Sequence, residues 1–498
     1  MTTATPRIGA AFAKLFGGAV VGKLLGLVRE LALAASFGTG TIASGLRAAQ
    51  TGTLIPAQFV TGETLSAGLV PLWARLARDD PRRANALLWA VAGTLLAFSV
   101  TVTALLLWGA GHWARFLFPG FDAEATLLTT RLLQIMALGI PFYVQSAVFW
   151  YWEMAHGGYA LAAARSTLQN VGLIAGIIAA WLTRNPLWLA WGFTSAYILL
   201  CLASPLWLAR RGMIGRTGRV PRDMLRSALA EFGRAVRPLI LLPFFFQAGI
   251  GLERALASLI SVGTVASLDY AKVIVETGLV LIAFPLGLAS LAELSRVSED
   301  SARRRIAQLV PVLLALTVPL SIALALNANS VVRLLFGRGA FDADSIRITA
   351  AILTGLGLGL WAQLTAYVLG KTLSARSRNR TMVRCTIIAI VCTATVQLLT
   401  WRQLGPFAFG LGAATGFTVQ LVLFARALEL LSVVGRGVLR VLPACAAYAL
   451  IGLTVPAARE SLLWAGILFG VTMAVVCATV PEMPDVPRFA FDAARRGE

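Results

Sequence analysis

The chain has 498 residues, of which 58% are hydrophobic and only 13% are charged. Soluble domains carry about 25% charged residues, so this composition excludes two or three soluble domains and predicts an all-α polytopic membrane protein. The formal net charge of +20 would point to nucleic acid in a soluble protein, whereas in a membrane protein it fits basic loops.

Fourteen apolar segments approach the length of about 20 residues that a helix needs to cross a bilayer. The first, second, seventh and eighth contain charged residues and are the weaker ones by hydropathy. The sequence therefore predicts about fourteen transmembrane helices. In chain order the segments lie near 12–36, 42–71, 86–110, 126–150, 159–182, 187–209, 237–261, 266–291, 307–330, 346–370, 383–401, 405–428, 438–457 and 461–480.

The loops between these segments differ in charge. If the N-terminus is cytoplasmic, 28 Lys and Arg residues fall in cytoplasmic loops and tails, against seven on the opposite side. Cytoplasmic loops of membrane proteins carry such an excess, so we expect both termini in the cytoplasm. The longest connector, near 210–236, is basic, and no loop has room for a soluble catalytic domain.

Short motifs recur between the two halves of the chain. GLVRELA at 26–32 returns as GLERALA at 251–257, an offset of 225 residues that also relates Gly38-Thr39 to Gly263-Thr264. An offset of 220 relates further pairs, which are Asp79-Asp80 with Glu299-Asp300, Arg83 with Arg303, Phe121-Asp122-Ala123 with Phe341-Asp342-Ala343, Thr129 with Thr349, and Gly139 with Gly359. Because an even number of spans separates each pair, the two copies form parallel repeats, and such repeats commonly hold a substrate cavity between them.

This repeat predicts the organisation of the chain as two six-helix lobes followed by two extra helices. The expected parts are an N-terminal lobe at 1–209, a basic cytoplasmic linker at 210–236, a C-terminal lobe at 237–430, two additional transmembrane helices at 431–481 and a cytoplasmic tail at 482–498.

Eight basic residues lie within the predicted spans, where a charge costs at least roughly 2.5 kcal/mol. Five of them belong to the first two spans of each repeat, and these are the candidate substrate-binding residues: Lys23, Arg29, Arg47, Arg254 and Lys272. Lys14, Arg131 and Arg165 lie near span ends, where long side chains reach the membrane surface.

Acidic residues accompany the five basic ones, and those assigned to charge balance or ion coupling are Glu30, Glu63, Asp269 and Glu276. Asp269, Lys272 and Glu276 have the spacing of one helical face. The set predicts a polar cavity that suits an anionic cargo such as a diphosphate, because arginine binds phosphate with two parallel hydrogen bonds. The alternative is that these residues form neutralised pairs that only hold helices together, and Glu63 is equally well explained as a packed polar residue.

Sequence signals for an enzyme, a metal site or a cofactor are weak. The five cysteines form no CxxC pair, there are only two histidines, and Gly370-Lys371-Thr372 has Thr365 where a Walker A loop needs glycine. Asp122, Glu124, Asp342 and Asp344 are the candidates for an extracytoplasmic catalytic pair, but they belong to the repeat and are interpreted as structural. We therefore expect a transporter that uses no nucleotide or other cofactor.

Three segments together resemble the MurJ/MviN family of lipid II flippases, over nearly the whole chain. They are GKLLGLVRE at 22–30 with FGTG at 37–40, ERALAS at 253–258 with GTVASLDYA at 263–271, and LFGRGAFD at 335–342. The family belongs to the MOP exporter superfamily, with polysaccharide flippases and MATE drug exporters. The resemblance implies an inward-open cavity, alternating access, and transport driven by the membrane potential or an ion gradient.

By position, Arg29 matches a cavity arginine of the family, Lys23 stands where arginine is usual, and Glu276 matches an acidic residue of the eighth span. Three positions depart from the family, because Ser44 replaces an aspartate and Ala57 and Val273 replace arginines, although Lys272 lies beside Val273.

These departures favour another cargo of the same chemical class over lipid II. The predicted function is a flippase of the bacterial inner membrane for a polyprenyl-diphosphate-linked oligosaccharide, an exopolysaccharide precursor. Lipid II is the first alternative, and a MATE-like cation antiporter is the second. The expected partners are the lipid-linked saccharide, membrane lipids, and the polymerase or glycosyltransferases of the same pathway, without nucleic acid.

Overall fold

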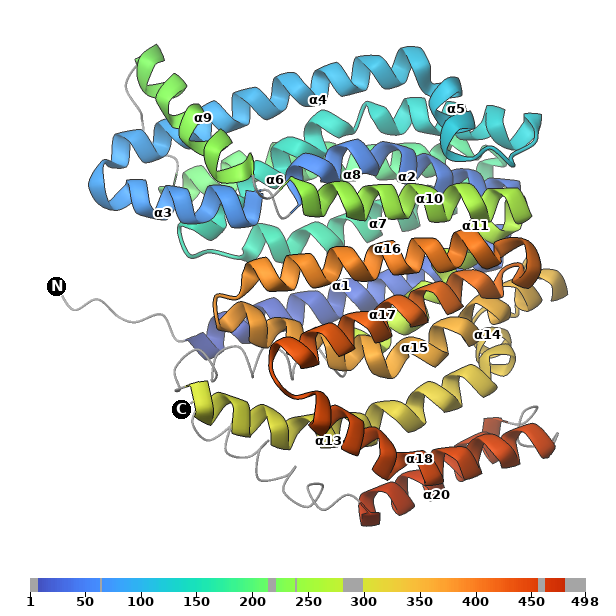
Figure 1. Cartoon of the computed structure of the whole chain (residues 1–498). Coiled ribbons are helices and arrows are strands. Elements are labelled where there is room, and N and C mark those ends of the chain that lie inside the picture. The colour runs from blue at the N-terminus through green and yellow to red at the C-terminus, as the bar shows by residue number, and fades with distance from the viewer. Residues whose placement is uncertain are drawn as a thin grey trace. The chain divides into compact units, whose positions relative to one another are not determined.

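The computed structural model of the chain describes residues 8–62, 65–213, 221–237, 240–280, 299–455 and 462–479. Within these ranges the chain forms helices joined by turns, with no β-strand, so the all-α prediction is confirmed (Figure 1). The chain divides into two compact units, Met1–Val265 (unit 1) and Ala266–Glu498 (unit 2). The predicted lobe boundaries at 210–236 stay a prediction.

Each of the fourteen predicted spans contains a helix. Unit 1 holds α1 (Ile8–Phe37), α2 (Thr41–Thr61), the π-helix η1 (Leu65–Leu69), α3 (Val70–Asp79), α4 (Pro81–Leu117), α5 (Ala123–Ala137), α6 (Ile140–Ala155), α7 (Ala160–Thr183), α8 (Leu187–Arg210), α9 (Arg222–Val236) and α10 (Leu241–Ile260). Helix α11 (Val262–Gly278) begins at the end of unit 1 and continues into unit 2. Unit 2 holds α13 (Glu299–Leu326), α14 (Ala328–Phe336), α15 (Ala343–Ala375), α16 (Asn379–Leu404), α17 (Phe407–Ala427), α18 (Leu431–Thr454) and α20 (Leu462–Thr479).

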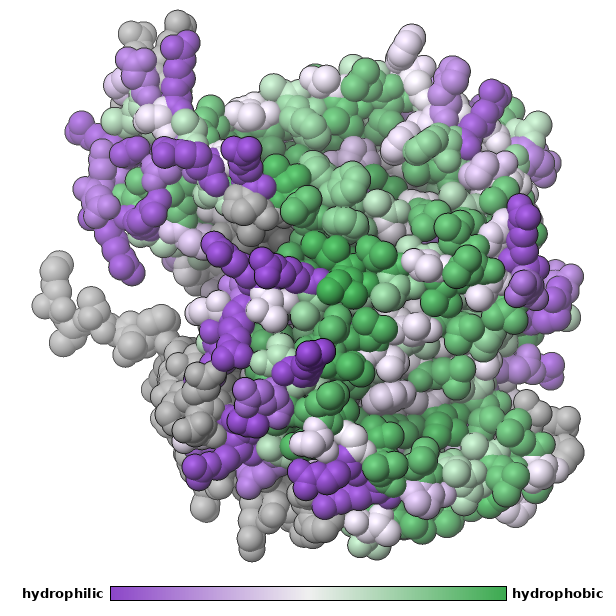
Figure 2. Space-filling model, viewed as in Figure 1, coloured by the Kyte–Doolittle hydropathy of each residue, from purple (hydrophilic) through white to green (hydrophobic). Residues whose placement is uncertain are grey.

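Among the described residues, eight helices are long and apolar enough to cross a membrane, or up to ten spans if each of two bent helix pairs is counted as one. The helices of the charged first, second, seventh and eighth spans do not pass this test alone. Large apolar side chains face outward on many helices, and Trp108 of α4 is 90% exposed. Figure 2 shows apolar residues over the middle of the helices and hydrophilic residues gathered at their ends, as lipid surroundings require.

Two predicted spans are interrupted. In the second, α2 ends at Thr61 and the chain continues as η1 and α3. In the fourth, α5 and α6 meet at an angle of 45°. Pro141 lies at the second position of α6, where no hydrogen bond within α6 needs its N–H, but it cannot donate to the last turn of α5 and so does not continue that helix. The matching helix of unit 2, α15, is continuous and has Trp361 at the equivalent position, whose N–H donates to Ser321 Oγ of α13 at 2.6 Å.

Glycines bring helices into close contact within each unit. On α8, a Cβ at Gly192 would lie 2.9 Å from the Cα of Gly176 on α7, so the two backbones touch. In unit 2, a Cβ at Gly412 of α17 would lie 2.5 Å from the side chain of Gln397 on α16. Small residues allow such close approach of membrane helices, where packing rather than the hydrophobic effect drives association.

The repeat seen in the sequence recurs in these local structures. The Asp122 carboxylate caps α5 by accepting a hydrogen bond from the Ala125 N–H at 2.8 Å, and the Asp342 carboxylate caps α15 in the same way from Ser345 at 2.8 Å. Gly192 of α8 and Gly412 of α17, each of which packs against the preceding helix, are also 220 residues apart. Asp122 and Asp342 are therefore helix caps, which explains their presence without catalysis.

The connector after each set of six spans is tied to its own unit by an ion pair. Within 210–236 the chain forms α9, whose Glu231 accepts from Arg75 at 2.5 Å and from Arg83 at 3.1 Å. In unit 2, Glu429 follows α17 and pairs with Arg303 at 2.6 Å. Since Arg83 and Arg303 are repeat equivalents, both halves use the same arginine to hold the chain segment that leaves the sixth helix.

Candidate functional site

Unit 1 brings together three of the predicted site residues at the contact of α1 with α2. The Glu30 carboxylate, on α1, forms ion pairs with both Arg29 and Arg47. Glu30 is 2% exposed and Arg47, on α2, is 5% exposed, while Arg29 is 18% exposed. A buried charge is tolerated only with a partner of opposite charge. The Glu30 carboxylate neutralises one of the two arginines, so the three residues together have a net charge of +1.

The Arg29 side chain is held by two helices. Its Nη1 donates to Oδ1 of Asn170 on α7 at 2.8 Å, while its Nε and Nη2 both donate to Glu30. A guanidinium has five N–H groups, and three of them are used in these bonds. Two N–H groups of Arg29 therefore have no protein partner among the described residues. Arg29 is also the most exposed of the three charged residues.

Asn170 is a functional candidate that the sequence reasoning missed. Besides accepting from Arg29, it donates from Nδ2 to the Gly22 carbonyl of α1 at 2.8 Å, and it is buried. Gly22 and Gly26 lie against α7, since a Cβ at Gly22 would be 2.7 Å from Ser166 Oγ and one at Gly26 would be 3.5 Å from Asn170. An uncharged amide in the middle of a predicted span was the signal that could have identified it.

Arg47 is oriented differently from Arg29. It is buried, pairs with Glu30, and donates from Nη1 to Gln50 Oε1 one helical turn away at 3.1 Å. In this arrangement the Arg47 side chain supports Glu30, and Arg29 is the arginine of the pair with the greater access to a ligand. The substrate-binding role predicted for Arg47 stays a prediction.

The second group of predicted residues lies on α10 and α11. Glu253 and Arg254 of α10 are both buried, and Arg254 donates to the Val265 carbonyl at 2.8 Å, across the turn into α11. Asp269, Lys272 and Glu276 lie on the single helix α11 with the predicted spacing, and Glu276 is exposed. Lys23 is half-buried on α1. Glu63 lies outside the described residues.

The three positions at which the family resemblance would place charges are buried and neutral. Ser44 is fully buried and its hydroxyl donates to the Thr39 carbonyl at 3.0 Å, while Ala57 and Val273 are buried apolar residues. No charge at these positions contributes to the recognition of a ligand in this chain.

A second buried carboxylate lies at the turn between α6 and α7. Glu153 is fully buried and accepts from the Leu161 N–H at 2.7 Å and from Trp207 Nε1 of α8 at 2.9 Å. It thereby joins the ends of three helices. Sequence reasoning did not select it, because a single acid at the end of a span resembles a solvated loop residue.

Among the described residues no group of His, Cys, Asp and Glu is arranged to hold a metal ion. Ionised side chains on helices that pack through glycines, in an all-helical chain with an internal repeat, are features typical of membrane transport proteins. The family model described as lipid II flippase MurJ matches residues 33–476. The chain therefore belongs to the MurJ family, whose members are flippases rather than catalysts.

Similar proteins are consistent with this membership. A probable lipid II flippase MurJ of Rhizobium tropici is 27% identical over 420 residues, covering 80% of this chain and 76% of the relative. One of Synechocystis is 26% identical over 417 residues, covering 78% and 75%. The solved structure of a lipid II flippase MurJ in an inward closed conformation has a TM-score of 0.76 at 15% identity, over 93% of this chain and 99% of that one. An inward-facing MATE family transporter of the MOP superfamily has a TM-score of 0.62 at 16% identity, over 86% and 98%, which shows a shared fold alone.

Proposed function

We propose that this chain is a flippase that moves a polyprenyl-diphosphate-linked oligosaccharide from the inner to the outer leaflet of the bacterial inner membrane by alternating access. The proposal rests on the geometry of the Arg29 guanidinium. Two of its N–H groups have no partner among the described residues, and its plane is fixed by Glu30 and Asn170. A guanidinium that never deprotonates and presents two parallel donors suits a diphosphate.

The proposed cargo is an exopolysaccharide precursor rather than lipid II. The neutral, buried side chains at Ser44, Ala57 and Val273 support this choice, because they leave fewer charges for a muropeptide-bearing head group. Lipid II remains the main alternative, since the relatives carry that substrate in their names.

Transport in this proposal is driven by the membrane potential or an ion gradient, without a nucleotide. Glu30, Asp269 and Glu276 are the described residues to which this proposal assigns charge balance or ion coupling. Lys23, Arg254 and Lys272 complete the proposed set of basic residues. Both termini lie in the cytoplasm in this proposal, and the polymerase or glycosyltransferases of the pathway are its partners.

The direct test is mass spectrometry of polyprenyl-linked saccharides in membranes after deletion of the gene and complementation. We expect wild-type protein and Arg131→Ala to prevent accumulation, and Arg29→Ala to fail at equal protein level. Arg131 is a matched control because it is an exposed arginine in another helix of the same unit. Wild-type transport by Arg29→Ala would refute the assignment of this arginine.

The accumulated species identifies the cargo. A lipid-linked oligosaccharide other than muropeptide supports the exopolysaccharide proposal, and a lipid-linked muropeptide assigns the chain to cell-wall synthesis instead. If no lipid-linked saccharide accumulates in cells that lack a redundant paralogue, the flippase proposal is wrong and a MATE-like antiporter becomes the better explanation.

A further inference from the structure

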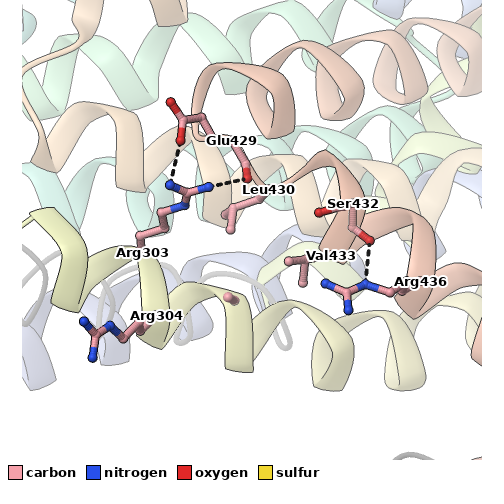
Figure 3. A pocket seen from close by; sticks show the side chains of 8 residues that line it. Arg303, Arg304, Glu429, Leu430, Ser432, Val433 and Arg436 are labelled. Atoms are coloured by element: carbon pink, nitrogen blue, oxygen red, sulfur yellow. Dashed lines mark hydrogen bonds and ion pairs between the residues drawn. The ribbon is translucent and has the colours of Figure 1, made fainter.

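Unit 2 contains a basic pocket outside the proposed transport site. It has a volume of about 390 Å³ and lies between the first turns of α13 and the connection from α17 to α18 (Figure 3). Its polar lining includes Arg303, Arg304, Glu429 and Arg436, and its apolar lining includes Leu430 and Val433. The pocket lies at the helix ends that the distribution of basic residues assigns to the cytoplasmic surface.

The charges of this pocket do not cancel. Arg303 pairs with the Glu429 carboxylate at 2.6 Å and donates to the Glu429 carbonyl at 3.2 Å. Arg304 and Arg436 have no acidic partner among the residues that the structure describes, and Arg436 donates only to the Ser432 carbonyl of its own helix at 3.3 Å. The pocket therefore has two positive charges in excess.

Comparison of the two repeats shows that the fold does not require this excess. The equivalent of Arg303 in unit 1 is Arg83, which forms the same kind of ion pair with a connector glutamate. The equivalent of Arg304, 220 residues earlier, is the buried Ala84. Arg436 belongs to α18, beyond the repeat. The pairing of Arg303 thus explains the architecture, and Arg304 and Arg436 are additions specific to unit 2.

Helix α18 also has exposed apolar side chains, and Leu439 lies one turn from Arg436. Leu431, Leu439 and Leu442 are exposed on this helix, Leu439 to 66%. A molecule with an anionic head and acyl chains would satisfy both surfaces at once, whereas free phosphate would use only the arginines. Basic pockets between membrane helices at the cytoplasmic surface are typical sites for anionic lipid head groups.

We propose that this pocket binds the phosphate of an anionic glycerophospholipid between Arg304 and Arg436, with the acyl chains lying along α18. The bound lipid would join α13 to α18, the first of the two helices that follow the repeats. The proposal is independent of the transported cargo, because none of these residues belongs to the proposed transport site.

The test uses the purified full chain and native mass spectrometry, with phosphatidylglycerol as the probe and phosphatidylcholine as the neutral comparison. Each arginine near an anionic lipid phosphate contributes roughly fivefold in affinity, so Arg304→Gln/Arg436→Gln should bind phosphatidylglycerol about 30-fold more weakly. The matched control, Arg380→Gln/Arg384→Gln, removes two exposed arginines of α16 at the same helix ends and should bind like the wild type. A single Arg304→Ala variant, which introduces the residue of the other repeat, serves as a milder change.

Three results would overturn the proposal. One is equal binding of phosphatidylglycerol and phosphatidylcholine by the wild type. Another is an equal loss in the control variant, which would indicate unspecific surface charge. The third is displacement of phosphatidylglycerol by inorganic phosphate at an equal concentration, which would identify a soluble phosphate as the ligand. Selective loss in the pocket variants, with unchanged elution and thermal unfolding, supports it.

Discussion

The Glu30 carboxylate is the most sensitive point of the charged cluster, because two arginines depend on it. Glu30→Gln keeps the shape of the side chain but takes the Glu30 counter-charge away from Arg47, which is 5% exposed. Removing one partner of a buried ion pair costs about 3–5 kcal/mol, because the other charge stays buried and uncompensated. Arg47→Met is expected to cost less, about 1–2 kcal/mol, because Glu30 keeps its pair with Arg29.

The double variant Glu30→Gln/Arg47→Met distinguishes this explanation from general loss of packing. It removes both buried charges and leaves Arg29, which is partly exposed and can be solvated. We therefore expect the double variant to be more stable than Glu30→Gln, with a coupling energy of about 2 kcal/mol between the two sites. Thermal unfolding of purified protein in one detergent, followed by tryptophan fluorescence, gives the order of stability. Additive losses in the double variant would refute the reasoning.

Three further predictions concern other parts of the chain. Asn170→Ala should lower transport while the protein still folds, because Arg29 loses an acceptor that orients it. Asn170→Asp keeps that acceptor and should retain more activity in the accumulation assay. Equal activity of the two variants would contradict this role of Asn170. Gly192→Ala should cost about 1–3 kcal/mol in thermal unfolding because its Cβ would meet the α7 backbone, whereas Gly93→Ala, in open space on α4, should be neutral or stabilising. The hydrogen bond from Ser345 lowers the pKa of the Asp342 carboxyl, so its capping contribution is present at neutral pH and is lost as the pH falls below about 4. Asp342→Ala should remove about 1 kcal/mol at neutral pH and less at low pH in the same unfolding assay, and a pH-independent loss would contradict the assignment.

The sequence is sufficient to predict the helices but not the contacts between them. Hydropathy locates most of the helices because the lipid requires a similar length and polarity of each span, whereas charged residues weaken the signal of the first, second, seventh and eighth. The repeat follows from local motifs, and Asp122 and Asp342 prove to be equivalent caps. Hydropathy cannot show that Gly139 and Pro141 divide one span into two helices, because both residues are common in membrane helices.

The partners of each charge depend on contacts between helices that are distant in sequence. Arg29 and Glu30 are adjacent, but their third partner, Asn170, is 140 residues from Glu30 and lies on another helix. Glu153 likewise acquires its role only when α8 places Trp207 against it. A single sequence contains no signal for such pairs. It identifies which residues of the predicted spans are charged, but not which of these side chains a ligand can reach.

The π-helix of unit 1 also bears on the history of the gene. Matching residues are 225 positions apart at Thr39 and Thr264, but 220 apart at Asp80 and Asp300, so the first copy is five residues longer in this stretch. The stretch contains the end of α2 and η1. A π-turn is closed by an i→i+5 hydrogen bond and so holds about one residue more than an α-helical turn. The two copies of the repeat have therefore diverged in length between Thr39 and Asp80, and η1 accommodates about one extra residue in that stretch without a new loop.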